Sequence, residues 1–212
     1  MKNILKIFAL IAFLFSNNAW ADNVADDSSK KAVKYITDVN DKIISIAANK
    51  SISDVKRKDQ LIAFIDGIVD SSWIAKFVLA KHYRTATNEQ KERFKDLYRQ
   101  FLINTYAPKF NSFGDQKFEI KGVSDQEKYY VVKCIFYPKD AANVSVDFRI
   151  KKVPETSEFA VLDIVIEGVS LIETQRSEFG SAIAASGLDK FLVDLDGRVK
   201  KLKVAPAISK AK

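Results

Sequence analysis

The chain has 212 residues, with 47% hydrophobic and 29% charged residues and a formal net charge of +7 at pH 7. This length suits one ordinary domain with a full hydrophobic core. Acidic residues interrupt every basic stretch except the tail, which argues against the concentrated basic face of a nucleic-acid-binding protein. The basic surplus therefore serves solubility or a weak attraction to anionic lipid surfaces. A single cysteine, Cys134, excludes an intrachain disulfide, so the fold has to be stable through its core.

The N-terminus has the three parts of a secretory signal peptide. Lys2 and Lys6 are basic, residues 7–15 are almost all apolar, and Ala19-Trp20-Ala21 is a small-x-small cleavage pattern. The apolar run is shorter than the ~20 residues that span a bilayer, which disfavours the alternative of a retained membrane anchor. We therefore expect export, with a signal peptide over 1–21, cleavage between Ala21 and Asp22, a flexible N-terminus over 22–31, a single domain over 32–202 and a flexible basic tail over 203–212.

The first half of the domain has helical periodicity. Apolar residues recur at spacings of three and four over residues 32–48, 55–69 and 71–81. The next helix begins with a capping box, in which Thr87 is followed three residues later by Gln90. After this box comes one wide apolar stripe, which we expect to face a sheet: Phe94, Leu97, Tyr98, Phe101, Leu102 and Tyr106.

Beyond Phe110 the apolar period changes to two, which predicts β-strands. Successive strands without intervening helices indicate an antiparallel meander. A last helix is predicted after Gly187-Leu188-Asp189. The fold class is α+β, with the N-terminal helices packed on one face of a curved antiparallel sheet of about four strands and a ligand cavity between helices and sheet. The four predicted strands are 117–123, 128–137, 144–151 and 159–167.

Catalytic motifs are absent from the sequence. His82 is the only histidine and has no His or Cys at metal-ligand spacing. Cys134 lies in an apolar strand, where a thiol is usually inert. Gly168-Val169-Ser170 begins like a nucleophile elbow but lacks the closing glycine. We therefore expect no enzyme, no metal and no cofactor. The chain is instead rich in aromatic residues, which either fill a core or line a ligand pocket.

Three segments carry a resemblance to a known family. The first is Phe77–Thr87, with Ala80 where the family usually has glycine, and the second is the helix that follows, from Glu89 to Tyr106. The third runs from Glu167 through Thr174-Gln175-Arg176-Ser177-Glu178-Phe179 to Gly187-Leu188-Asp189. In this order they resemble MlaC, the toluene-tolerance auxiliary family of periplasmic phospholipid-binding proteins that maintain outer-membrane lipid asymmetry. The match covers residues 30–200.

The resemblance implies a fold like those of nuclear transport factor two and the cystatins, with the lipid tails inside. It also implies a periplasmic location and phospholipid as cargo rather than as a cofactor. Two membrane partners follow from it: an inner-membrane ABC transporter with a periplasmic lipid-binding domain, and an outer-membrane lipoprotein associated with a porin. We expect a monomer that binds no nucleic acid.

The lipid-binding side chains are expected on the predicted stripe, on the strands that face it and on the helix before it. A carrier of another apolar ligand, such as an isoprenoid or a solvent, would have a similar sequence, and so would an adaptor protein with a filled core. About half of the candidates should touch ligand, because pockets share their walls with the core. The candidates are Trp73, Phe77, Phe94, Leu97, Tyr98, Phe101, Leu102, Tyr106, Val146, Phe148, Val165, Val169 and Leu171.

Overall fold

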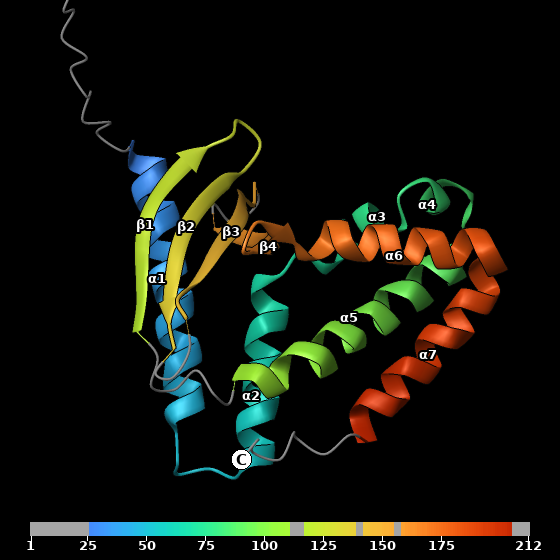
Figure 1. Cartoon of the computed structure of the whole chain (residues 1–212), viewed down its shortest axis with the longest axis horizontal. Coiled ribbons are helices and arrows are strands. Elements are labelled where there is room, and N and C mark those ends of the chain that lie inside the picture. The colour runs from blue at the N-terminus through green and yellow to red at the C-terminus, as the bar shows by residue number, and fades with distance from the viewer. Residues whose placement is uncertain (1–25, 111–116, 139–141, 155–157, 205–212) are drawn as a thin grey trace, which may run out of the picture.

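The computed structural model describes residues 26–110, 117–138, 142–154 and 158–204 (Figure 1). The predicted signal peptide and its cleavage site lie outside the described residues, as does the tail from residue 205. Over the described ranges, no helix is long and apolar enough to cross a membrane.

An antiparallel sheet forms one part of the molecule. Its strands follow one another in sequence order, so each hydrogen-bonds to its neighbours in the chain. This arrangement confirms the α+β class and the predicted meander, with one very short strand more than expected. The register shifts between Ile120 and Gly122, an irregularity that bends a strand. The five strands are β1 (Lys117–Asp125), β2 (Tyr130–Tyr137), β3 (Val144–Lys152), β4 (Phe159–Ile166) and β5 (Val169–Ser170).

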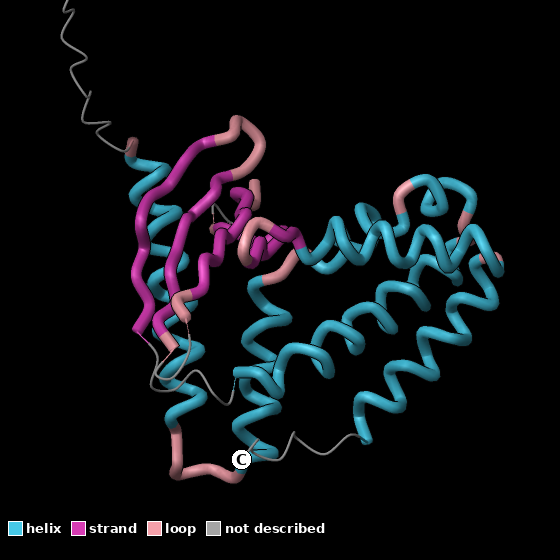
Figure 2. The backbone as a smooth tube through the Cα atoms, viewed as in Figure 1, coloured by secondary structure: helices cyan, strands magenta, loops and turns pink. Residues whose placement is uncertain are grey.

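The helices divide between the two parts of the molecule. Helix α1 runs along the sheet and packs on β1 and β2, whereas α3 to α7 form a separate helical lobe (Figures 1 and 2). Helix α2 lies between the two and contacts α1, α5 and β4. The helices are α1 (Asp27–Ala48), α2 (Asp54–Ile68), α3 (Ser71–Leu79), α4 (Lys81–Thr85), α5 (Asn88–Phe110), α6 (Leu171–Ser186) and α7 (Leu188–Val204).

Side-chain caps determine where several of these helices begin, among them α1 and α5. Helix α1 begins at Asp27 because the Asp26 carboxylate accepts a hydrogen bond of 2.6 Å from the Ser29 backbone N–H. The chain is therefore helical from Asp27, inside the segment predicted to be flexible. The capping box before α5 is confirmed: the backbone N–H of Gln90 donates to Thr87 Oγ1 at 3.1 Å, and that of Thr87 donates to Gln90 Oε1 at 2.9 Å.

Helix α6 is not predicted by the hydrophobic pattern. Its buried face consists of Ile172, Gln175, Phe179 and Ile183, so a polar side chain interrupts the apolar stripe. The Ser170 hydroxyl caps the helix by accepting the Glu173 backbone N–H at 3.1 Å. With α6 and α7 present, the helical lobe has a core of its own.

The buried apolar side chains form two cores rather than one. The sheet core joins α1 to the strands through residues such as Ile36, Val132 and Ile150. The helical core joins α3, α5, α6 and α7, and its centre is aromatic: Phe179 lies 5.0 Å from Phe191 between ring centroids. The expectation that the whole α5 stripe faces the sheet is therefore wrong. Three of its members pack in the helical core instead, because α6 and α7 supply apolar partners on that side: Phe94, Leu97 and Phe101.

Candidate functional site

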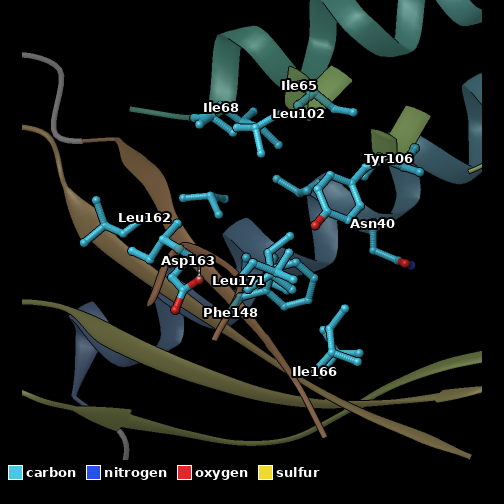
Figure 3. A pocket seen from close by; sticks show the side chains of 18 of the residues that line it. Asn40, Ile65, Ile68, Leu102, Tyr106, Phe148, Leu162, Asp163, Ile166 and Leu171 are labelled. Atoms are coloured by element: carbon cyan, nitrogen blue, oxygen red, sulfur yellow. Dashed lines mark hydrogen bonds between the residues drawn. The ribbon is translucent and has the colours of Figure 1, made fainter. Parts of the chain in front are cut away.

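A cavity of about 430 Å³ lies between the sheet and the helices that border it. Figure 3 shows Ile65, Ile68 and Leu102 on one side of the space and Phe148 on the other. Further walls come from α1, β2, β4 and the start of α6. Aliphatic and aromatic side chains predominate, including Ile36, Val39, Ile43, Ile44, Ile74, Ile103, Phe136, Val144, Val161, Leu162, Ile164, Ile166 and Ile172. Such a surface suits an apolar ligand.

The polar residues of the wall are few, and two of them bond to each other. Tyr98 on α5 donates a hydrogen bond to Gln175 Oε1 on α6. Burial raises the pKa of Tyr106 above its ordinary value, and a hydrogen bond with Gln175 partly offsets the rise. These groups satisfy one another inside the protein, so they add little polarity to the cavity.

Asp163 is the one carboxylate that the described residues place in the wall, and its side chain is fully buried. Its Oδ2 accepts a hydrogen bond from the Ser170 hydroxyl at 2.6 Å, and its Oδ1 accepts one from the Ile172 backbone N–H at 3.2 Å. Arg149 Nη1 lies 3.2 Å from Oδ2 and 3.0 Å from Glu173 Oε1. The Asp163 carboxylate thus joins β3, β4 and the start of α6 beside the cavity.

An ion pair joins α2 and α5, two of the helices that line the cavity. Arg99 on α5 donates from Nε to Asp66 Oδ1 on α2 at 2.8 Å, and its second nitrogen contacts the other carboxylate oxygen. A bidentate pair of this kind fixes orientation as well as distance. Leu61 is the one fully buried residue of α2, and the ion pair adds a polar contact between α2 and α5.

Six of the thirteen residues predicted to bind lipid line this cavity: Tyr98, Leu102, Tyr106, Val146, Phe148 and Leu171. The other seven lie elsewhere. Trp73 and Phe77 line a second cleft on the helical lobe. Phe94, Leu97 and Phe101 lie in the helical core, and Val165 is buried in β4. Val169 is 57% exposed, at the start of β5.

Sequence reasoning missed the contributions of α1 and α2 to the cavity. Five α1 residues line it at helical spacing (Ile36, Val39, Asn40, Ile43 and Ile44), and Ile65 and Ile68 come from α2. The helical periodicity of both segments was visible in the sequence. What the pattern lacked was any sign that these apolar faces border a space rather than a filled core.

The residues considered for catalysis do not form a catalytic arrangement. Ser170 bonds to Asp163 and caps α6, while His82 lies in α4, where its Nε2 is buried without a hydrogen-bond partner. Burial raises the pKa of Cys134 to about 12, with a contribution from Asp147. In the part of the chain that the structure describes, no cluster of three or more His, Cys, Asp or Glu side chains is arranged to hold a metal ion.

An α+β domain with a largely apolar cavity between sheet and helices has the architecture of a ligand-pocket protein. The chain belongs to the MlaC family, whose sequence profile, described as "MlaC protein", matches residues 37–196. The resemblance drawn from the three sequence segments is thus confirmed at the level of the family.

Individual relatives agree with this assignment. The chain is 21% identical over 192 residues to the intermembrane phospholipid transport system binding protein MlaC of Haemophilus influenzae, covering 89% of this chain and 88% of the relative. It is 25% identical over 151 residues to the toluene tolerance protein ttg2D of Pseudomonas putida, covering 69% of each. A solved phospholipid-binding protein from Ralstonia solanacearum, in complex with a phospholipid, shares the fold, with a TM-score of 0.69 at 23% identity. That similarity covers 84% of this chain and 99% of the other.

Proposed function

We propose that the protein is a phospholipid carrier that holds acyl chains in the cavity between sheet and helices. The observation that carries this proposal is the largely apolar wall of the cavity, whose polar groups are mostly bonded within the protein. It is supported by family membership and by two relatives, one named for phospholipid transport and one solved with a phospholipid bound.

The energetics explain why such a carrier is needed. Burying one methylene group contributes about 0.8 kcal/mol, and a two-tailed phospholipid has on the order of thirty of them. Moving the bare lipid through water would therefore cost roughly 20 kcal/mol. A cavity that shields the tails removes most of this barrier, and the transfer from bilayer to cavity is then close to balanced. A shuttle needs this balance in order to load and to unload.

The proposal extends to location and partners through the MlaC family. The protein works in the periplasm and moves lipid between an inner-membrane ABC transporter and an outer-membrane lipoprotein–porin complex, so that outer-membrane lipid asymmetry is maintained. It acts as a monomer and without catalysis, metal or cofactor. The pairing of Ser170 with Asp163, without a histidine in their hydrogen-bond network, supports a structural role for both.

A charge placed on the cavity wall tests the proposal. Leu102 lines the cavity, whereas Val169 is mostly exposed and does not. Leu102→Glu should abolish copurified phospholipid, because an unpaired carboxylate among alkyl chains is costly. Val169→Glu introduces the same charge and should keep the lipid load. The load is measured by solvent extraction of the purified protein and mass spectrometry.

Circular dichroism checks that both variants are folded. If Leu102→Glu does not fold, Ile43→Trp tests the same cavity by filling it with an apolar ring. A folded Leu102→Glu or Ile43→Trp variant with a full phospholipid load would refute the proposed location. An isoprenoid or other hydrocarbon in the wild-type extract would assign a different cargo, and an empty wild-type protein that cannot be loaded would favour an adaptor.

A further inference from the structure

A second cleft of about 380 Å³ lies on the helical lobe, between α3, α4 and α6. Three of its lining residues are aromatic (Trp73, Phe77 and Tyr83) and three are basic (Lys76, Arg84 and Arg176). Over the ranges that the structure describes, no acidic side chain lines it. It is separate from the lipid cavity, which is lined from the same helices by other residues, such as Ile74 and Gln175.

Two of the three basic groups of the cleft lie against aromatic rings rather than against carboxylates. The Arg176 guanidinium lies 4.8 Å from the centroid of the Phe77 ring, and Lys76 Nζ lies 5.9 Å from that of Tyr83. Among the ion pairs of the described residues, none includes Lys76, Arg84 or Arg176. A cation stacked on a ring keeps its N–H donors available, so the cleft presents several unneutralised donors to solvent.

Two separate stretches of sequence build this cleft. Phe77, Tyr83 and Arg84 belong to the segment 77–87, and Arg176 belongs to the segment 174–179. Both segments carry the resemblance to the MlaC family, yet none of these four side chains lines the lipid cavity. The proposed carrier function therefore leaves them without a role.

We propose that this cleft binds the phosphate of anionic phospholipid head groups displayed at a membrane surface. Arg matches phosphate oxygens bidentately and Lys adds a point charge, so three such side chains without acidic partners favour a phosphate group. The aromatic rings that line the cleft (Trp73, Phe77 and Tyr83) suit the glycerol and the first methylene groups beside that phosphate. Trp and Tyr together with basic residues are also the side chains enriched where proteins meet a bilayer. A cleft of this volume is of the size that accommodates a small ligand.

This inference is independent of whether the cavity holds lipid, and vesicle binding tests it separately from the cargo load. The full protein is sedimented with vesicles of phosphatidylglycerol and phosphatidylcholine at low ionic strength, and with vesicles of phosphatidylcholine alone. We expect a preference for the anionic vesicles that Lys76→Gln/Arg84→Gln weakens by about thirty-fold, since each basic group at an anionic surface contributes about five-fold. The pair leaves Arg176 on Phe77, so the fold is little disturbed.

The matched control is Lys201→Gln/Lys203→Gln, which removes the same charge from exposed positions near the end of α7. It should bind within about two-fold of the wild type. The fluorescence of Trp73 reports binding at the cleft itself, because its emission should shift to the blue on anionic vesicles. The variant Trp73→Phe identifies the part of the fluorescence signal that comes from this residue. An equal loss in both double variants would overturn the proposal, because it would show attraction by net charge alone. A wild-type protein that shows no preference for phosphatidylglycerol vesicles would also overturn the proposal. A saturable Trp73 response to soluble glycerol phosphate or to an acidic peptide, measured without vesicles, would overturn it too.

Discussion

The hydroxyl of Tyr98 donates a hydrogen bond to the side-chain carbonyl of Gln175, which joins α5 to α6 at the wall of the apolar cavity. Burial raises the pKa of Tyr98 far above its ordinary value, with smaller contributions from Tyr106 and Asp163, so the hydroxyl stays protonated. Because Tyr98 belongs to the helical core and also lines the cavity, this one bond connects the packing of the lobe to the shape of the cavity.

Tyr98→Phe should lower the free energy of unfolding by about 1–3 kcal/mol, since Gln175 loses a buried partner. Gln175→Leu should cost a similar amount, because the Tyr98 hydroxyl is then left without its acceptor. The double variant Tyr98→Phe/Gln175→Leu should be more stable than the sum of the single effects predicts, because both polar groups are gone. Urea denaturation of the four proteins measures this coupling, and strictly additive losses would contradict it.

The pH dependence of stability should reveal Asp163. Burial raises the pKa of this carboxyl above its ordinary value of 3.8, although hydrogen bonds from Ser170 and Ile172 and the charge of Arg149 oppose the rise. A raised pKa means that the folded state binds the proton more tightly than the unfolded state. The stabilising contribution is therefore fully present below about pH 3.8 and is lost as the pH rises through the pKa of the folded state.

We expect the free energy of unfolding of the wild type, minus that of Asp163→Asn, to fall as the pH increases from about 3 to about 7. Taking this difference removes the effect of the other carboxylates, some of which have lowered pKa values, such as Asp26 and Glu119. A difference that grows with pH would show that Arg149 and the hydrogen bonds outweigh burial.

The thiol of Cys134 should be nearly inert in the folded protein. It is buried in β2, and its pKa of about 12 compares with an ordinary value of 9.0. At pH 8 this difference alone lowers the thiolate fraction by about a thousandfold. Iodoacetamide should therefore label the native protein at least that much more slowly than the protein unfolded in guanidinium. Comparable rates in the two states would place the thiol at the surface.

Ala80→Gly should stabilise the protein. Ala80 separates α3 from α4 with φ 49° and ψ −121°, a backbone conformation that favours glycine because it has no Cβ. Relief of this strain exceeds the entropy that glycine adds to the unfolded chain, so we expect a gain of about 1 kcal/mol. Thermal denaturation measures it.

The control for Ala80→Gly is the same substitution at Ala184, an exposed position inside α6. There the change should destabilise by about 1 kcal/mol. Effects of the same sign at both positions would contradict the argument from backbone conformation.

Local patterns predicted much of the fold and only part of the site. The alternation in β3 and the capping box of Thr87 and Gln90 depend on neighbouring residues, so they could be read from the sequence. Helix α6 could not, because Gln175 on its buried face finds its partner, Tyr98, far away in the chain.

The apolar stripe of α5 is divided between the helical core and the cavity, and this division also depends on partners that are distant in the sequence. Phe94 packs on Phe179 of the unpredicted helix, with 6.3 Å between ring centroids, whereas Leu102 on the same stripe lines the cavity. Periodicity identifies an apolar face, but it does not identify which of two neighbours covers that face. It also does not distinguish a filled contact from a cavity, which is why Ile43 and Ile65 were missed.

The position of α1 has a consequence for the order of folding. This helix comes first in the described chain, but the strands that cover it, β1 and β2, come after all of α2 to α5. The strands pair with their sequence neighbours and need little loop closure, whereas α1 closes a long loop. Until then α1 can contact α2, but Ile36 lacks the strand residues that cover it in the sheet core. The first helix of the described residues is thus among the last to gain its full set of contacts.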